Sequence, residues 1–287
     1  MKISADNIRE LRDRTGLGLG DCKKALEECG GDIDKAVDKL RVVGLAKAGK
    51  KSDRVASDGL IAMHLTENSG VLVEINCETD FVTRNEKFVE LVSNLALLAC
   101  RERCTSVGNL KSVKYEGIGT VREAIMNCSS VLGERLELGK ICYLEAKNGI
   151  VAGYVHGSTS NLGKIGALVA LESSGNKVKL QEIGKQIAMH IVAMKPEAFS
   201  IGDLDQEKLN KERSVIEEHI SSLNKPEEVA KKIADGRMAK YYEEVVLLEQ
   251  KFIKDDKMKV SDFIKSSESN LSCSIALSSY KLLVLGN

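Results

Sequence analysis

The chain has 287 residues, of which 42 are Lys or Arg and 42 are Asp or Glu, so its formal net charge is zero at neutral pH. This balance argues against direct binding of nucleic acid, because the usual basic binders gain affinity from cationic side chains that release counterions. The length predicts about two domains, and a hydrophobic share of 43% is sufficient for a buried core.

The sequence predicts neither a membrane span nor a metal site. Hydrophobic runs such as residues 95–99 and 282–285 are far shorter than the roughly 18 residues of a membrane helix. The chain begins with a polar helical pattern and no signal-peptide stretch, so a cytoplasmic protein is expected. The cysteines are widely spread, which favours buried free thiols. Cys100 and Cys104 could share a helix face, but no second pair at zinc-ligand spacing accompanies them.

Residues 1–46 predict a unit of three short helices. Polar residues that suit N-caps begin the helices, and glycines end each of them. The expected caps are Ser4, Asp21 and Asp32, and the expected ends are Gly16, the pair Gly30 and Gly31, and Gly44. A linker over residues 47–56 follows, since residues 47–54 are mostly small or basic.

Residues 57–138 predict a first α+β unit. Two aliphatic runs separated by turn-forming residues predict a β-hairpin over residues 60–65 and 71–77. A helix with a broad apolar face is predicted over residues 85–100, and a capping-box sequence begins another at Thr120.

A second unit of the same order is predicted over residues 139–195 and 245–287. Asn148 and Gly149 form a strong hairpin signal between two strand-like runs. The predicted elements are strands over residues 140–146, 150–156, 165–172 and 274–285 and helices over residues 177–194 and 260–265. The fold class is therefore α+β, with antiparallel sheets in two related units.

Residues 196–244 predict a helical hairpin that projects from the core. The segment 205–223 is strongly charged with helical character, and another helix begins after Pro226. Pro196 and Pro226 are the only prolines, and their positions fit helix starts.

A glycine-rich segment over residues 157–166 is similar to a phosphate-binding loop but departs from it. Five residues separate Gly157 from Gly163, where the motif has four, and Lys164 is followed by an isoleucine in place of a hydroxyl residue. A turn between strands is favoured. A small nucleotide-dependent enzyme that uses this segment remains the alternative function, and a binding module built on residues 1–45 is a third.

Residues 76–85 contain the strongest candidate for a binding site. A polar strand exit places Phe81 between Asp80 and Val82. Phe81 could turn into the core while Asp80 or Thr83 caps the next helix, and the pattern alone favours this interpretation. The other interpretation is an exposed aromatic anchor, a type of residue that concentrates binding energy at protein interfaces.

The chain resembles the elongation factor Ts family, the bacterial guanine-nucleotide exchange factors of elongation factor Tu, in order over nearly its whole length. The resembling motifs are residues 11–16 with 21–26, residues 31–33 with Ala36, residues 76–82, His156 with Gly157, residues 187–196 and residues 236–238. The resemblance implies a three-helix domain of the ubiquitin-associated (UBA) type, a core of two α+β subdomains and a coiled-coil arm.

The resemblance also implies a site and a mechanism. In the family the Asp-Phe pair, here Asp80 and Phe81, protrudes into the partner's GTPase domain, disturbs its Mg²⁺ and phosphate site and loosens GDP. Thr79 and Val82 are then the supports of the loop. Such a factor makes and breaks no bond and has no cofactor of its own.

Weaker partner contacts are implied at three further residues. Arg12 and Leu19 lie where the family's N-terminal domain touches elongation factor Tu, and His156 matches a position that faces the partner's more distal domains. Family members commonly carry methionines where this chain has Leu19 and Gly20. The sequence leaves self-association of the chain open.

Overall fold

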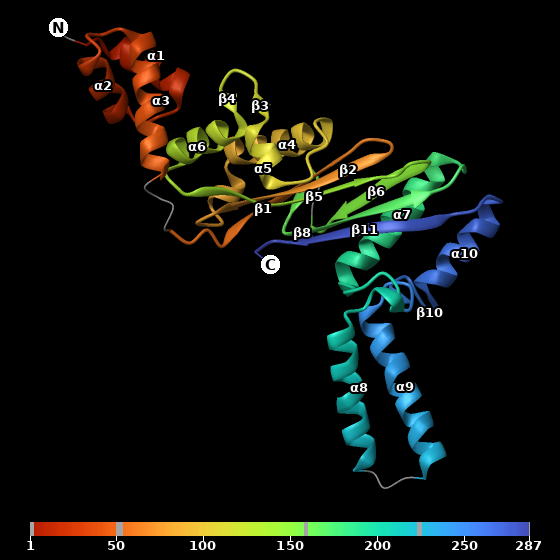
Figure 1. The fold of residues 1–287 in the computed structure, drawn as a ribbon. Helices are drawn as coiled ribbons and strands as arrows, with labels where there is room; N and C mark the ends of the chain where they lie inside the picture. Colours follow the sequence, from red (N-terminus) through yellow and green to blue (C-terminus); the bar gives the residue numbers. More distant parts are fainter. Residues whose placement is uncertain (1–2, 50–53, 158–159, 223–225, 287) are drawn as a thin grey trace.

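The computed structural model describes residues 3–49, 54–157, 160–222 and 226–286. Figure 1 shows a mixed α+β fold with three helices at the N-terminal end, a central body of sheets and helices, and a pair of long helices that projects from the body. The strands of both large sheets run antiparallel.

The first three helices enclose a small core of their own. They are α1 (Ala5–Thr15), α2 (Leu19–Glu28) and α3 (Ile33–Gly49). Their buried residues are Leu11, Cys22, Ala25, Leu26, Ala36 and Leu40. The predicted Ser4 cap is confirmed, since its Oγ accepts a hydrogen bond from the Asn7 N–H at 3.1 Å. Gly16 ends α1 with φ of 71°, a conformation that glycine adopts without strain.

Two helix boundaries differ from the prediction. Gly18 is the N-cap of α2, so Asp21 lies within its first turn, where a carboxylate favours the positive end of the helix dipole. Helix α3 passes Gly44 and ends at Gly49, because leucine, alanine and lysine continue the chain and favour helix. Residues 47–49 of the predicted linker are therefore helical, and residues 50–53 lie outside the described residues.

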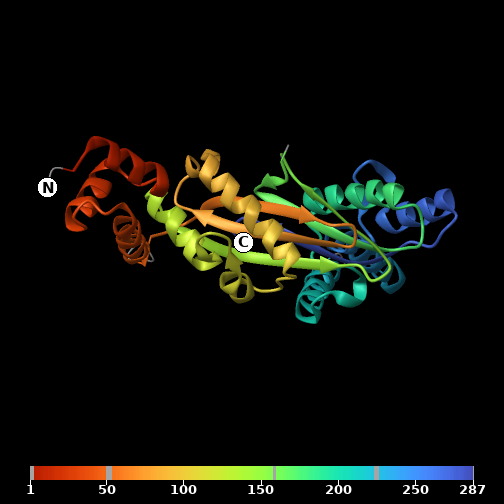
Figure 2. The same ribbon diagram turned by 90° about the horizontal axis from the view of Figure 1, so that it is seen from above.

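The predicted first hairpin is confirmed and belongs to a sheet of order β5-β2-β1-β7. Its strands are β1 (Asp58–Leu65), β2 (Ser69–Cys77), β5 (Leu136–Glu145) and β7 (Leu162–Gly163). Figure 2 shows α4 lying over the strands of this sheet, with α6 beside it. Both helices pack against one face of the sheet around a core that includes Val73, Phe88 and Leu95.

The segment between β2 and β5 supplies the helices on that face. Its elements are η1 (Val82–Arg84), α4 (Glu86–Arg101), α5 (Val107–Ser112), β3 (Lys114–Tyr115), β4 (Gly119–Thr120) and α6 (Val121–Leu132). The predicted capping box at the start of α6 is confirmed, because the side chains of Thr120 and Glu123 each accept a hydrogen bond from the other residue's backbone N–H.

A second sheet, of order β11-β8-β6, faces the first. Its strands and the elements around it are β6 (Gly149–Val155), β8 (Ile165–Glu172), β11 (Ala276–Val284), α7 (Lys177–Met194), α10 (Val260–Leu271) and the small pair β9 (Lys251–Phe252) and β10 (Asp255–Lys259). An apolar layer joins the sheets, with Leu72 and Leu144 from the first and Val151, Leu168 and Leu283 from the second. The body therefore has helices outside and two sheets inside.

The hairpin predicted around Asn148 and Gly149 is wrong. Strand β5 pairs with β2, whereas β6 pairs with β8, so the two strands belong to different sheets. The backbone N–H groups of Lys147 and Asn148 instead donate to the Glu172 carboxylate at 2.9 and 2.7 Å. The predicted boundary between residues 138 and 139 consequently falls inside β5.

The projecting pair consists of α8 (Gln206–Ser221) and α9 (Glu227–Val245), which lie side by side in Figure 1. Pro226 precedes α9 as predicted. Pro196 does not begin a helix, because Asp205 caps α8 and the intervening chain contains η2 (Ile201–Asp203). A parallel bridge between Ala198 and Val246 joins the two segments at the root of the pair.

Candidate functional site

The β2–α4 loop, residues 78–85, displays an exposed aromatic side chain. Phe81 is 80% exposed, whereas Val82 is buried. Since Val82 takes the inward position at the start of η1, Phe81 is left in solvent. The interpretation of Phe81 as a core residue is wrong, and that of an exposed aromatic is correct. An exposed phenylalanine forgoes roughly 1.5–3 kcal/mol of burial, which a second protein could recover.

Short hydrogen bonds hold the turn that follows Phe81. The Thr83 hydroxyl donates to the Asp80 carbonyl at 2.6 Å, and the Asn85 N–H donates to the Val82 carbonyl at 2.9 Å. The Asn85 side chain accepts from the Lys87 N–H at 3.0 Å and so caps α4. The expectation that Asp80 or Thr83 caps this helix is therefore wrong.

Thr79 is held by all of its polar groups. Its N–H and hydroxyl both donate to the Glu134 carboxylate, at 3.0 and 2.6 Å. Its carbonyl accepts a hydrogen bond from the Cys77 thiol at 3.1 Å. Burial raises the pKa of Cys77 to about 12, and the charges of Asp58 and Glu134 add to the shift, so the thiol keeps its proton at neutral pH.

A second carboxylate connects the foot of the loop, residues 78 and 79, to neighbouring segments. Glu78 accepts a hydrogen bond from the Arg135 N–H at 2.6 Å and pairs with the Arg54 guanidinium at 3.3 Å. The Arg135 guanidinium donates in turn to the Arg54 carbonyl. The loop therefore stands on a base made from the end of β2, the start of β5 and the chain before β1.

Asp80 offers a carboxylate beside the aromatic ring. Its side chain is 53% exposed and lies 3.9 Å from the Arg84 guanidinium, an exposed pair of the kind that contributes little free energy. Lys164 donates to Asp58 at 2.8 Å. This hydrogen bond raises the pKa of Lys164, with a smaller contribution from the charge of Asp80, and lowers the pKa of Asp58. The loop tip thus combines an apolar ring with an accessible negative charge.

The three weaker candidates lie on other elements than the β2–α4 loop. Arg12 is exposed on α1, and Leu19, at the start of α2, is 49% exposed. An added Cβ at Gly20 would meet no atom within 4 Å, so the surface beside Leu19 is open. His156 is exposed at the end of β6, where its Nδ1 lies 3.2 Å from the Tyr154 hydroxyl. Among the described residues, no hydrogen bond or ion pair connects Arg12, Leu19 or His156 to Thr79–Val82.

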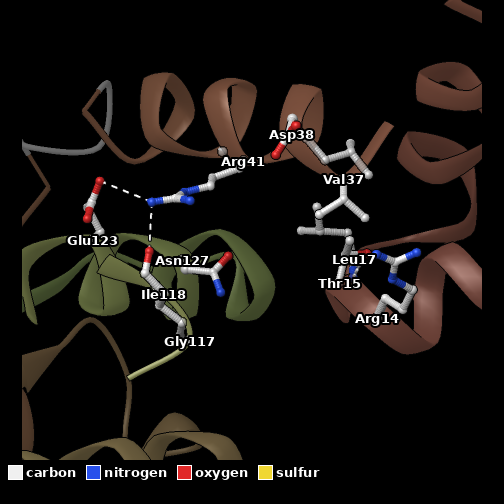
Figure 3. Close-up of a pocket in the computed structure, with 12 residues that line it drawn as sticks. Arg14, Thr15, Leu17, Val37, Asp38, Arg41, Gly117, Ile118, Glu123 and Asn127 are labelled. Carbon is white, nitrogen blue, oxygen red and sulfur yellow. Dashed lines mark hydrogen bonds and ion pairs between the residues drawn. The ribbon is translucent and has the colours of Figure 1, made fainter. Parts of the chain in front are cut away.

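The N-terminal helices dock on α6 through Arg41 (Figure 3). Its guanidinium donates to the Ile118 carbonyl at 2.7 Å and to the Glu123 carboxylate at 3.2 Å. A cavity of about 270 Å³ lies beside this contact, slightly below the roughly 300–1,000 Å³ of small-molecule pockets. Arg14, the other cation at its wall, is paired with Asp34 at 2.7 Å. We interpret the cavity as space left between the N-terminal helices and the body where the two pack together.

The glycine-rich segment over residues 157–166 does not have the form of a phosphate-binding loop. Residues 158–159 lie outside the described residues. The described part forms β7, which pairs with β1, and then enters β8. A phosphate-binding loop leads into a helix whose N-terminal N–H groups hold the phosphate. Since a strand follows here, the structure argues against the nucleotide-dependent enzyme.

The described residues contain no group of three or more His, Cys, Asp and Glu side chains arranged to hold a metal ion. Cys100 and Cys104 are both buried. Within the same described residues, no helix has the length and apolarity that crossing a membrane requires.

The sequence interpretation did not place Glu134, Arg135 or Lys164 near the loop, although all three lie close to its base. Glu134 is 55 residues from Thr79 along the chain, and no local pattern marks it. A charged residue after a helix end is usually a solvated side chain, so only the pairing of β5 with β2 shows where Glu134 lies. A prediction of strand pairing could have found it.

Comparisons with known proteins agree with the motif resemblance. The sequence model of the family described as Elongation factor TS matches residues 78–286. The chain is 77% identical over 287 residues to elongation factor Ts of Wolbachia pipientis wMel, covering 100% of this chain and 99% of that protein. It is 50% identical over 286 residues to elongation factor Ts of Ehrlichia canis (strain Jake), covering 99% of each.

Proposed function

Because the chain belongs to the elongation factor Ts family, we propose that it binds the GDP form of elongation factor Tu and accelerates the exchange of GDP for GTP. The observation that carries the proposal is Phe81, 80% exposed on a loop whose backbone is held on both sides. The ring enters the GTPase domain near the Mg²⁺ and phosphate site, and Asp80 makes the adjacent polar contact.

The mechanism is differential binding. A factor that binds the nucleotide-free GTPase more tightly than the GDP form must weaken GDP binding by the same factor. The chain makes and breaks no bond, needs no cofactor and acts in the cytoplasm without direct contact to nucleic acid. Burial of the Phe81 ring in the partner supplies part of the free energy that opposes the binding of GDP.

The loop presents its tip at low entropic cost. Thr79 is held through Glu134, and Val82 is buried beneath the turn. A side chain on a backbone that is already ordered loses less entropy on binding than one on a mobile loop. Thr79 and Val82 therefore support the exchange loop without being its main contacts.

Two further surfaces extend the partner contact. We expect the N-terminal helices to act as a UBA-like domain over residues 1–46 that touches elongation factor Tu through Arg12 and Leu19. We expect His156, exposed on the body, to meet the partner's more distal domains. Since these residues belong to other elements than the loop, they would hold the partner while Phe81 acts on the nucleotide site.

The remaining organisation is proposed on the same basis. After the linker over residues 47–56, a core subdomain begins at residue 57 and extends through β5, because β5 pairs with β2. The second subdomain contains the other sheet and residues 245–287. The helical pair within residues 196–244 is a coiled-coil arm, and self-association of the chain is a separate question that solution mass measurement answers.

Release of fluorescent GDP from elongation factor Tu, followed by stopped flow, tests the function. The unmodified protein is expected to accelerate release. In the Phe81→Ala variant the acceleration should be about 30-fold smaller, because truncation of an interface hot spot costs about 2 kcal/mol. Val178→Ala, which shortens a 70% exposed side chain on α7, is the control and should change little.

An unchanged release rate with the unmodified protein would contradict the exchange function itself. Equal acceleration by the protein and by Phe81→Ala would retain exchange but remove Phe81 from the mechanism.

A further inference from the structure

We infer that Glu134 is the positioning residue of nucleotide exchange, holding Thr79 so that Phe81 is aimed at the partner before the two proteins meet. The inference rests on the proposed function and extends it to a residue outside the β2–α4 loop. Glu134 accepts both hydrogen bonds that Thr79 can donate, at 3.0 Å from the N–H and 2.6 Å from the hydroxyl. Thr79 is two positions before Phe81 in the chain.

The chemistry of the contact favours a carboxylate. Two donors point at one side chain, and an ionised carboxylate is the side chain that offers two accepting oxygens without a donor. A glutamine at position 134 would keep one acceptor for the Thr79 N–H, but its amide N–H₂ could meet the Thr79 hydroxyl only if that hydroxyl reversed and accepted, and the negative charge would be lost. Hydrogen bonds to charged groups are also about twice as strong as those between neutral groups.

Glu134 is itself fixed at both ends. Gly133 ends α6 in the left-handed conformation, with φ of 77°. The Ser129 hydroxyl donates to the Glu134 carbonyl at 2.6 Å. The next residue, Arg135, donates its N–H to Glu78 at 2.6 Å, and β5 begins at Leu136, opposite Cys77. A helix end and a strand start therefore position the carboxylate, which transmits that position to Thr79.

Loss of Glu134 should affect the insertion of Phe81 more than the first encounter. Arg12, Leu19 and His156 are separate exposed candidates for holding the partner. If the loop populates other conformations, the fraction with Phe81 correctly aimed falls, and the maximal release rate falls with that fraction. The concentration at half-maximal rate, set by the other contacts, should change much less.

The test is stopped-flow GDP release from elongation factor Tu over a range of factor concentrations, with full-length Glu134→Gln. We expect the maximal rate to fall about tenfold, which corresponds to one charge-assisted hydrogen bond, and the half-saturating concentration to change less than about threefold. Glu116→Gln, an exposed glutamate in the turn between β3 and β4, is the matched control. Thr79→Val removes the hydroxyl alone, and Thr79→Ser should restore most of the rate.

Two double variants separate positioning from general destabilisation. In a Phe81→Ala background, Glu134→Gln should have almost no further effect, because no ring remains to be aimed. Glu134→Gln combined with Thr79→Val should lose no more than the larger single loss.

A full additional loss in the Phe81→Ala background would overturn the inference. So would an unchanged rate for Glu134→Gln beside an active unmodified protein. If Glu134→Gln does not fold, an unchanged rate for Thr79→Val would overturn the inference in its place. Failure of the unmodified protein to accelerate release would count against the proposed function instead.

Discussion

Two polar networks hold the two projecting parts of this molecule, and they are built in opposite ways. At the foot of the β2–α4 loop, Thr79 binds the charged carboxylate of Glu134 in a half-buried position. At the root of the α8–α9 pair, His190 and Gln250 are each 0% exposed, and His190 Nε2 lies 2.9 Å from Gln250 Oε1. The depth of burial decides which chemistry is used.

The hydrogen bonds at the arm root assign a neutral histidine. The Ile253 N–H donates to His190 Nδ1 at 3.2 Å, so Nδ1 is an acceptor and carries no proton. The proton is on Nε2, which donates a hydrogen bond to Gln250 Oε1. Gln250 Nε2 then donates to the Glu244 carbonyl near the end of α9, at 2.8 Å. Burial lowers the pKa of His190. Of these two sites, the one that water reaches holds a carboxylate, and the fully buried one holds a neutral network.

The largest effect on stability is expected at the arm root. His190→Ala should lower the free energy of unfolding by about 3 kcal/mol, because it leaves the buried Oε1 of Gln250 without its donor and removes the ring that stacks on Phe252. Urea denaturation followed by circular dichroism measures the change. His219→Ala, exposed on α8, is the control. Equal small losses in both variants would show that the network contributes little.

A smaller loss is expected from Val82→Ala beneath the loop. Val82 is 7% exposed, and removal of buried methyl groups should cost about 2 kcal/mol. The same denaturation measurement applies, with Val178→Ala on α7 as an exposed valine control. A cost indistinguishable from the control would mean that Val82 does not anchor the turn.

The arm root should also make stability depend on pH. Because the pKa of His190 is lowered in the folded protein, its contribution is fully present above the ordinary value near 6.5 and declines as the pH falls below it. The decline has a maximal slope of about 1.4 kcal/mol per pH unit and ends below the folded-state pKa. The free energy of unfolding, measured from roughly pH 7.5 down to roughly pH 5, should show this slope.

Replacement of His190 by glutamine provides the control for that measurement. The slope between these pH values should become shallower, because the variant lacks the imidazole whereas the remaining titrating groups are unchanged. An identical slope in the variant would assign the pH dependence to other residues.

The smallest effect on stability is expected from Phe81→Ala. The side chain is 80% exposed, and exposed substitutions usually change stability by less than about 0.5 kcal/mol. Thermal unfolding of this variant should therefore match that of the unmodified protein, although its exchange activity falls. A large drop in melting temperature would show that the ring has a structural role.

Local sequence signals predicted most of the elements of this fold. The Ser4 cap, the capping box at Thr120 and the hairpin of β1 and β2 depend on residues close together in the chain. The sequence also predicted the strand-like runs that form most of β5 and β6 on either side of Asn148 and Gly149. It could not show that they belong to different sheets, because a strand with suitable faces can pair with several others.

The candidate site divides in the same way. The motif from Thr79 to Val82 was found from the sequence through a family resemblance, but the residue pattern alone favoured a buried Phe81. The direction of that ring depends on which of two adjacent apolar residues faces the core, and Val82 takes that place. Neither periodicity nor capping rules distinguish the two residues within a single turn.

The sequence by itself determined the α+β class, the order of the elements and the family to which the chain belongs, since these depend on local periodicity and short motifs. The tertiary structure alone decided that β5 joins β2 and that Glu134 meets Thr79 across 55 residues. It also decided between the two interpretations of Phe81, which faces solvent. The physical reason is that long-range partners are selected by the packing of complete faces, which no short segment encodes.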